Sequence, residues 1–313
     1  MSTHQGSGEG IVAVEVSRSF GSVHAVRDAS FECRPGTVTA LIGPNGSGKT
    51  TLMLMLASLL QPDTGTIEVG GFNPTLNPAA VRARLGWMPD VLGSWSSLTV
   101  RATLEVTGRL YRQDRETSAL RASELLELVG LDELADQPTR VLSRGQKQRL
   151  SLARALVHDP SVLLLDEPAS GLDPNARVEL RQLVRRVAAA GKTVLVSSHV
   201  LAELDEMADT AVYLEKGVTA SAESIARSKS TARLWRIRSM DTGSLHAALL
   251  AAGISATSIE SDRTELLVPL DGEASAAALL ARLVSAGVLI SAFAPAVGDL
   301  EHTFLDLSKD SAR

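Results

Sequence analysis

The stretch GPNGSGKT, residues 43–50, is the strongest indicator of the fold of this chain. It fits the pattern G-x-x-x-x-G-K-[ST], it follows an apolar run at residues 38–42 that predicts a buried strand, and it precedes an apolar run at residues 52–57 that predicts a buried helix. The glycines of such a loop let backbone N–H groups turn inward on an anion, and the new helix points its positive end at the same place. In this pattern Lys49 reaches the outer phosphates and the Thr50 hydroxyl binds magnesium. The stretch therefore predicts a cradle for a nucleoside triphosphate.

Length and composition limit the number of domains and the classes of protein to which the chain can belong. It has 313 residues, enough for one large domain or two modest ones, and 44% of them are hydrophobic, which supports a full core. A net charge of −5 argues against a surface built for nucleic acid, because such surfaces carry a basic patch or stripe. Cys33 is the single cysteine, so no disulfide forms within the chain. No stretch approaches the ~20 apolar residues of a membrane helix, so we expect the chain not to cross a bilayer by itself.

The order of apolar and polar runs predicts an α/β fold followed by a smaller domain. Uninterrupted apolar strands at residues 162–165 and 193–197 alternate with helices, which is typical of a parallel sheet covered on both faces. Beyond a polar stretch near residues 223–231, the pattern becomes β-α-β-β-α-β, the order of the ferredoxin-like split motif, with its second strand expected at residues 254–260. The predicted parts are a disordered leader that is not a secretory signal (1–10), a nucleotide-binding domain (11–228) with a helical part (about 91–141), and a small α+β domain (229–313).

A second motif supplies carboxylates. The apolar strand at residues 162–167 ends in Asp166 and Glu167. In a protein with this phosphate-binding loop, that strand end lies beside the phosphates. We therefore expect Asp166 to hold magnesium, directly or through water, and Glu167 to orient an attacking water.

The third motif is LSRGQKQR, residues 142–149, which predicts a helix capped by Ser143. The Ser143 hydroxyl, the Gly145 amide and the helix dipole make a second anion site. One chain rarely needs two separate helix starts for one nucleotide. The motif thus predicts a head-to-tail dimer in which the loop of one subunit and Ser143 of the other meet the same nucleotide.

Taken together, these motifs resemble the nucleotide-binding subunit of an ABC transporter. Residues 11–220 follow the family order: Walker A loop at 43–50, signature at 142–146, Walker B strand at 162–167, D-loop SGLD at 170–173, and the switch histidine His199. The resemblance implies a P-loop ATPase fold with a parallel core sheet, an antiparallel β subdomain and a helical subdomain. It also implies ATP hydrolysis in a two-subunit sandwich. Residues 229–313 resemble the ferredoxin-like accessory domain of ATPases that pair with ABC-2-type membrane subunits, which favours export.

The resemblance assigns roles residue by residue. Glu167 is implied as the general base, His199 as the contact that links the γ-phosphate to Glu167, and Lys49 as the third catalytic residue. The implied magnesium ligands are Thr50, Asp166 and Asp90. The implied nucleotide contacts, with Phe20 stacking on adenine, are Phe20, Gly43, Pro44, Asn45, Gly46, Ser47, Gly48, Lys49, Thr50, Thr51, Ser143, Gly145, Gln146 and Asp173.

Two residues depart from the family pattern. Asp90 stands where the family usually has glutamine; its oxygens suit magnesium, but an ionised carboxylate donates no hydrogen bond to water. Arg144 replaces the first glycine of the signature pair, where it either adds positive charge near a partner's nucleotide or faces solvent. Trp95 lies in the region where the family binds the membrane subunit, and it is either an interface anchor or a buried side chain.

The expected function is an ATP-binding, ATP-hydrolysing subunit that powers an exporter. Its expected partners are ATP with Mg²⁺, a second ATPase subunit in a homodimer or heterodimer, and integral-membrane permease subunits, with no nucleic acid. Through the permease it would sit peripherally on the inner face of the cell membrane. The alternatives are a soluble ABC-type ATPase acting on ribosomes or DNA, and a regulatory subunit that binds ATP without hydrolysing it. The single P-loop and the acidic balance disfavour the first, and intact Lys49, Asp166, Glu167 and His199 disfavour the second.

Overall fold

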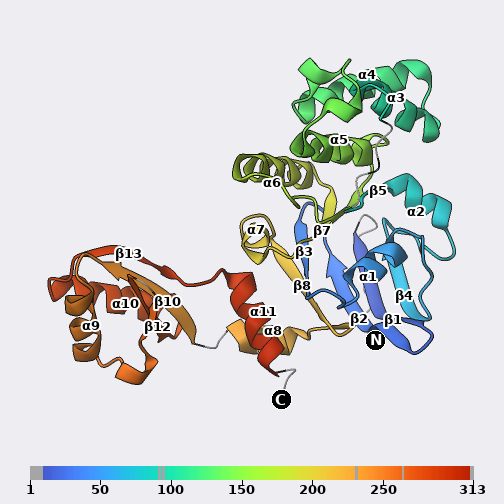
Figure 1. Cartoon of the computed structure of the whole chain (residues 1–313). Coiled ribbons are helices and arrows are strands. Elements are labelled where there is room, and N and C mark those ends of the chain that lie inside the picture. Colours follow the sequence, from blue (N-terminus) through green and yellow to red (C-terminus); the bar gives the residue numbers. More distant parts are fainter. Residues whose placement is uncertain (1–9, 91–92, 94–95, 230–231, 263, 311–313) are drawn as a thin grey trace. The chain divides into compact units, whose positions relative to one another are not determined.

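The computed structural model describes residues 10–90, 93, 96–229, 232–262 and 264–310, which form two compact units (Figure 1). The first unit ends at Ala220 and the second begins at Ser221. The stretch at 223–231, where the sequence places the boundary, carries helix α8 (Ala222–Lys229) of the second unit. The leader expected at 1–10, apart from Gly10, and Trp95 lie outside the described residues.

A nine-stranded sheet in the order β4-β1-β2-β9-β8-β3-β7-β6-β5 forms the first unit. The five strands from β8 to β5 run parallel. β3, β6 and β7 are buried along their whole length, which explains why their sequences are unbroken apolar runs. Their bounds are β3 (Val38–Ile42), β5 (Leu85–Met88), β6 (Val162–Asp166), β7 (Thr193–Ser197) and β8 (Thr210–Glu215).

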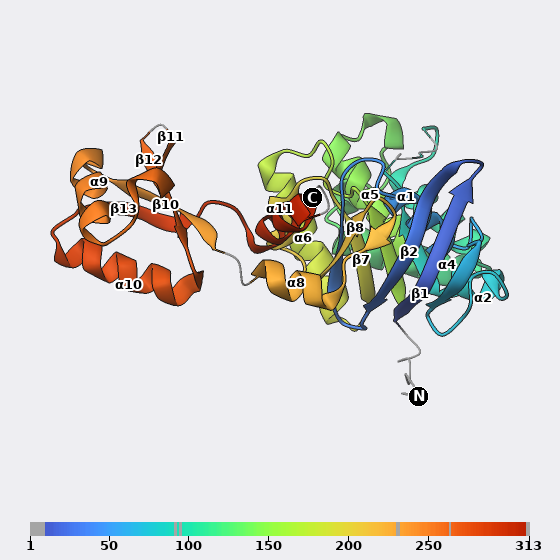
Figure 2. The same ribbon diagram turned by 90° about the horizontal axis from the view of Figure 1, so that it is seen from below.

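The remaining strands form the other, mainly antiparallel part of this sheet, in which Figure 2 shows β1 beside β2. β1 (Ile11–Phe20) pairs antiparallel with both β2 (Val23–Cys33) and β4 (Thr64–Val69), and the short β9 (Val218–Thr219) joins β2 to β8. The β1–β2 register shifts between Ala13 and Val16 and again around Arg18. Such bulges bend and twist a strand pair and change which side chains face the core.

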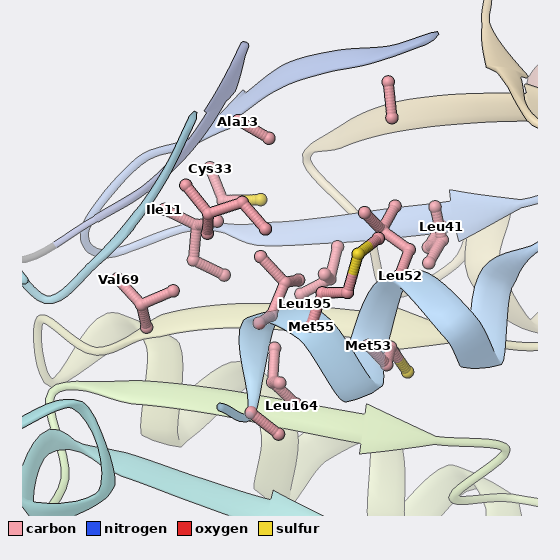
Figure 3. Close-up of a cluster of buried hydrophobic side chains, with 14 of the residues drawn as sticks. Ile11, Ala13, Cys33, Leu41, Leu52, Met53, Met55, Val69, Leu164 and Leu195 are labelled. Atoms are coloured by element: carbon pink, nitrogen blue, oxygen red, sulfur yellow. The ribbon is translucent and has the colours of Figure 1, made fainter. Parts of the chain in front are cut away.

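Helix α1 (Lys49–Leu56) packs between the two parts of the sheet. Figure 3 shows Ile11 and Cys33 from the antiparallel strands and Leu164 and Leu195 from the parallel strands, gathered in one cluster with the side chains of α1. Cys33 is 1% exposed, and burial raises the pKa of its thiol to about 12. The phosphate-binding loop therefore leads into a helix that is fixed on two sides.

The other helices of the first unit cover the sheet or form a separate group. α3 (Val100–Leu110), α4 (Arg115–Leu128) and α5 (Arg144–Leu156) pack together, as Figure 1 shows. Near the end of the helical part expected at about 91–141, the chain forms the 3₁₀ turns Asp132–Leu134 and Thr139–Val141. The remaining helices are α2 (Pro78–Arg84), α6 (Pro174–Ala189) and α7 (Leu201–Asp205).

The second unit contains a four-stranded antiparallel sheet in the order β11-β12-β10-β13. Its chain order after α8 is β10 (Arg233–Ser239), α9 (Thr242–Ala251), β11 (Glu260–Asp262), β12 (Glu265–Leu270), α10 (Gly272–Ser285), β13 (Ile290–Pro295) and α11 (Asp299–Asp310). Trp235 and Ile237 of β10 pack on Leu249 of α9 and Leu279 of α10. The expected strand at 254–260 was wrong for most of its length, because residues 256–258 form a 3₁₀ turn and β11 begins only at Glu260. In the described part of the chain, no helix is both long and apolar enough to span a membrane.

Candidate functional site

A cavity of about 500 Å³ gathers most of the residues that the sequence singles out. It lies where segments that follow β3, β5, β6 and β7 meet the start of α1. Ten expected residues line it: Asn45, Gly46, Gly48, Lys49, Thr50, Thr51, Asp90, Asp166, Glu167 and His199. The other lining residues are Val23, His24, Ala25 and Ser170, which sequence reasoning did not assign to the site.

Two glycines let the phosphate-binding loop lie flush against neighbouring strands. A Cβ on Gly43 would sit 2.2 Å from the carbonyl oxygen of Leu214 in β8. Gly48 has φ +106°, and a Cβ there would sit 2.3 Å from the carbonyl oxygen of Ala25 in β2. Any side chain at either position would have to displace backbone, and at Gly48 it would also be strained. This close approach makes the first residues of β2 part of the cavity wall.

Lys49 is the first residue of α1, and its side chain turns back along the loop. Nζ donates to the carbonyl oxygens of Gly43 at 2.6 Å and Pro44 at 3.2 Å. Burial lowers the pKa of this amine, while the negative charges of Glu167 and Asp166 oppose that shift. The loop thus holds an ammonium group within the electrostatic reach of both carboxylates.

Asp166 is the last residue of β6, and β7 fixes its carboxylate. Asp166 and Ser197 are paired across the two parallel strands, and Ser197 Oγ donates to Asp166 Oδ1 at 2.6 Å. Asp166 is 8% exposed. Burial raises its pKa; the Ser197 bond opposes that rise, and the charges of Glu167 and Asp90 add to it. The site therefore concentrates negative charge that a cation would relieve.

Glu167 follows in an unusual backbone conformation. Its φ is +50°, in the left-handed region that residues other than glycine seldom adopt. Its N–H lies 3.2 Å from both the carbonyl oxygen and Oγ of Ser197, and its Oε2 lies 2.7 Å from Nδ1 of His199. Left-handed residues of this kind cluster at functional sites because the surrounding structure has to enforce them. Here the enforcement comes from the end of β7 and the residues just after it.

The donor set suits magnesium held together with phosphate. The Thr50 hydroxyl and the Asp90 and Asp166 carboxylates line one cavity, and all are the hard oxygen donors that magnesium prefers. Within the described residues no cluster of three or more His, Cys, Asp or Glu side chains would hold a metal ion by itself. Magnesium commonly completes its shell with water and substrate phosphates, so these residues fit an ion that arrives with the nucleotide.

Phe20 lies at the end of β1 and is 48% exposed. The Arg18 guanidinium stacks over its ring at 4.9 Å from the centroid. Phe20 is not among the described residues that line the cavity, whereas His24 is, with its Nδ1 2.8 Å from Ser19 Oγ. Gly43, Pro44 and Ser47 belong to the loop but also fall outside that lining.

The signature residues form a second cluster that is separate from the cavity lining. Ser143 caps α5: its Oγ accepts from Gln146 N–H at 3.2 Å, and Gln146 Oε1 accepts from Ser143 N–H at 2.8 Å. A Cβ on Gly145 would lie 3.4 Å from the Cβ of Ala176 in α6, which places the two helix starts side by side. Asp173 caps α6 by accepting from Ala176 N–H at 3.0 Å. Within one chain, these expected nucleotide contacts therefore do not join the Walker A loop in one pocket.

Comparison with known proteins gives these clusters a family. Residues 26–170 match the ABC transporter family model. The chain is 33% identical over 299 residues to the daunorubicin resistance ATP-binding protein DrrA3 of Streptomyces coeruleorubidus, covering 95% of each. It is 39% identical over 202 residues to Nod factor export ATP-binding protein I of Burkholderia lata, covering 64% of this chain and 66% of that one.

A solved ATP-binding subunit of an ABC transporter superposes with a TM-score of 0.62 and 26% identity, covering 69% of this chain and 92% of the other. The P-loop ATPase fold expected from the sequence, with its parallel core and antiparallel part, is confirmed. The match to DrrA3 extends through the second unit as well. This chain belongs to the ABC transporter family and is an ATP-binding, ATP-hydrolysing subunit that powers transport.

Proposed function

We propose that this subunit drives an exporter by closing, with ATP, into a head-to-tail dimer with a second ATPase subunit. The observation that carries the proposal is the separation of two anion-binding helix starts. The start of α1 lines the cavity with Lys49 and Thr50, while the start of α5 presents Ser143 and Gly145 elsewhere. A second chain that brings its α5 to this cavity would complete the nucleotide site.

The α5 start is suited to that task. The Ser143 hydroxyl accepts a hydrogen bond from Gln146 N–H, so its own proton stays available for an anion. The partial positive charge at the helix start favours the same anion. ATP would then bind the closed dimer better than the open subunit, which is the condition for a ligand to drive a conformational change.

Within the cavity, Glu167 is the proposed general base. Its Oε2 is held 2.7 Å from Nδ1 of His199, so Nε2 is the His199 nitrogen left to face the γ-phosphate. Glu167 would take the proton of a water aligned with the γ-phosphorus, and Lys49 would neutralise phosphate charge. Magnesium held by Thr50, Asp166 and Asp90 would supply further neutralisation of that charge.

Export is proposed from the relatives. DrrA3 is named for resistance to daunorubicin and the Burkholderia protein for export of Nod factor. For the permease we propose a groove of about 450 Å³ whose lining includes Trp87, Pro89, Tyr111 and Arg154. Docking there would hold the subunit on the inner face of the membrane.

The test uses Glu167→Gln, which keeps the shape of the side chain but removes the base. With ATP and Mg²⁺ this variant should elute as a dimer in size-exclusion chromatography and should hydrolyse ATP at least about 100-fold more slowly than wild type, as expected for loss of a general base. Adding Lys49→Ala to it should abolish the ATP-dependent dimer. A Glu167→Gln protein that binds ATP but stays monomeric would refute the dimer. Wild-type turnover in that variant would refute Glu167 as the base.

A further inference from the structure

Arg144, the residue that departs from the glycine of the family signature, reaches the D-loop (170–173) of its own chain. Its Nε donates to the carbonyl oxygen of Ser170 at 2.8 Å, and its Nη2 lies 3.4 Å from Ser170 Oγ. The guanidinium lies against Gly171, where a Cβ would sit 2.5 Å from Nε and 2.7 Å from Cζ. Gly171 has φ +69°, so the D-loop turn leaves room for the arginine only because this residue is glycine.

A second arginine holds the other flank of the same turn. Nε of Arg177, in α6, donates to the carbonyl oxygen of Leu172 at 2.9 Å. Its Nη1 lies 2.9 Å from Oε1 of Glu203, whose side chain is 16% exposed. Glu203 lies on α7, which begins two residues after His199. The D-loop carbonyls at 170 and 172 are thus each fixed by an arginine, one at the start of α5 and one linked to α7 through Glu203.

The D-loop is also part of the nucleotide cavity. Ser170 lines it, and Ser170 N–H donates to the carbonyl oxygen of Glu167 at 3.1 Å. Arg144 therefore connects the start of α5 to a residue that is one hydrogen bond away from the proposed base. A glycine at position 144 has no side chain and makes none of these contacts.

We propose that Arg144 is a positioning residue that ties the signature helix to Ser170 and so couples the two nucleotide sites of the dimer. The proposal rests on the head-to-tail dimer described above. In that dimer Ser143 and Gly145 meet the partner's nucleotide, whereas Ser170 lines the cavity for the chain's own nucleotide. Engagement of α5 at one site is then transmitted through the arginine to the D-loop of the other. Neither alternative from the sequence included this contact: Arg144 is exposed, but its guanidinium is hydrogen-bonded within its own chain.

The first test measures the D-loop directly in the full chain without nucleotide. Amide hydrogen exchange should be about tenfold faster or more in peptides covering residues 168–174 of Arg144→Ala, because a hydrogen bond from a charged donor is lost. Exchange in peptides covering the Walker A loop should not change. Arg140→Ala is the matched control, since it removes a nearby exposed charge that makes no D-loop contact in the described structure. The exchange rate of these peptides in Arg144→Lys should lie between those of wild type and Arg144→Ala, because lysine keeps the charge but lacks the several N–H donors of the guanidinium.

The second test measures coupling by ATP hydrolysis of the intact protein. Arg144→Ala should lower kcat about tenfold and bring the Hill coefficient for ATP toward one, with the Kd of a single chain for ATP unchanged. Arg144→Lys should recover part of both losses, and Arg140→Ala should match wild type.

The outcomes separate this inference from the proposed function. If exchange and kcat of Arg144→Ala match those of Arg140→Ala while Glu167→Gln still dimerises with ATP, the arginine is not a positioning residue and the dimer stands. If Arg144→Ala stops dimerisation with D-loop exchange unchanged, Arg144 acts directly on the partner's nucleotide and the inference is overturned. If Glu167→Gln itself stays monomeric, the dimer fails, and with it the coupling.

Discussion

Ser197→Ala tests the idea that β7 sets the state of the Asp166 carboxylate. Ser197 is fully buried, and its hydroxyl donates the 2.6 Å bond to Asp166 Oδ1. A hydrogen bond to a charged group contributes about 1.5–3 kcal/mol, and its loss leaves a buried carboxylate oxygen without that donor. We therefore expect the variant to lose about 2 kcal/mol of unfolding free energy at pH 7.5, measured by urea denaturation with circular dichroism.

The loss should depend on pH with a defined sign. The Ser197 bond lowers the pKa of Asp166 against the rise caused by burial, so the variant's Asp166 has the higher pKa. The folded variant binds a proton more readily than folded wild type, so raising the pH through that range destabilises the variant relative to wild type. The difference between the two proteins should accordingly shrink at acid pH.

Ser118→Ala is the matched control, because Ser118 is 2% exposed and its Oγ, on α4, has no hydrogen-bond partner among the described residues. The difference in unfolding free energy between this variant and wild type should stay the same as the pH falls. The reasoning is refuted if Ser197→Ala unfolds within about 0.5 kcal/mol of wild type at pH 7.5, the range of an ordinary surface substitution. It is also refuted if the difference stays constant as the pH falls.

Three further outcomes follow from particular contacts. Gly48→Ala, whose Cβ would sit 2.3 Å from the Ala25 carbonyl oxygen, should abolish binding of fluorescent ATP, and wild-type affinity would contradict the tight fit. Burial lowers the pKa of His158 to about 4, so the unfolding free energy of wild type should fall by up to about 1.4 kcal/mol per pH unit between about pH 6.5 and 4. His158→Phe should reduce this pH dependence in urea denaturation, and an equal pH dependence in the two proteins would contradict the prediction. Leu249→Ala, at a fully buried position in the second unit, should cost about 2–5 kcal/mol there in thermal unfolding and leave ATP affinity unchanged; a drop in affinity would contradict two separate units.

The parts of the fold that could be predicted are those with a local signal. The buried strands β3, β6 and β7 are unbroken apolar runs, and α5 begins with a serine whose capping box is written in four residues. The loop between β3 and α1 is recognised by the spacing of its glycines and by the Lys49 that follows them. These signals predict that Lys49, Asp166 and Glu167 share one site, and all three line the cavity.

What could not be predicted depends on register and on distant contacts. Val23, His24 and Ala25 reach the cavity because β2 pairs with a bulged β1 and lies against Gly48, and their own sequence carries no mark of this. The sequence marks Ser197 only as part of a strand, and it is the β6–β7 register that places it opposite Asp166. Arg144 meets Ser170 across 26 positions of sequence, so its partner becomes visible only when α5 and the D-loop are packed together.

The burial of Cys33 has a practical consequence for studying motion in this ATPase. The chain has one thiol, it is 1% exposed, and its raised pKa keeps it protonated and unreactive near neutral pH. The native protein should therefore not react with maleimide reagents. A single cysteine introduced at an exposed position of α6 would carry a spin label or dye without removing any native residue from the core. In the proposed dimer, the distance between two such labels, one on each subunit, would report opening and closing during turnover.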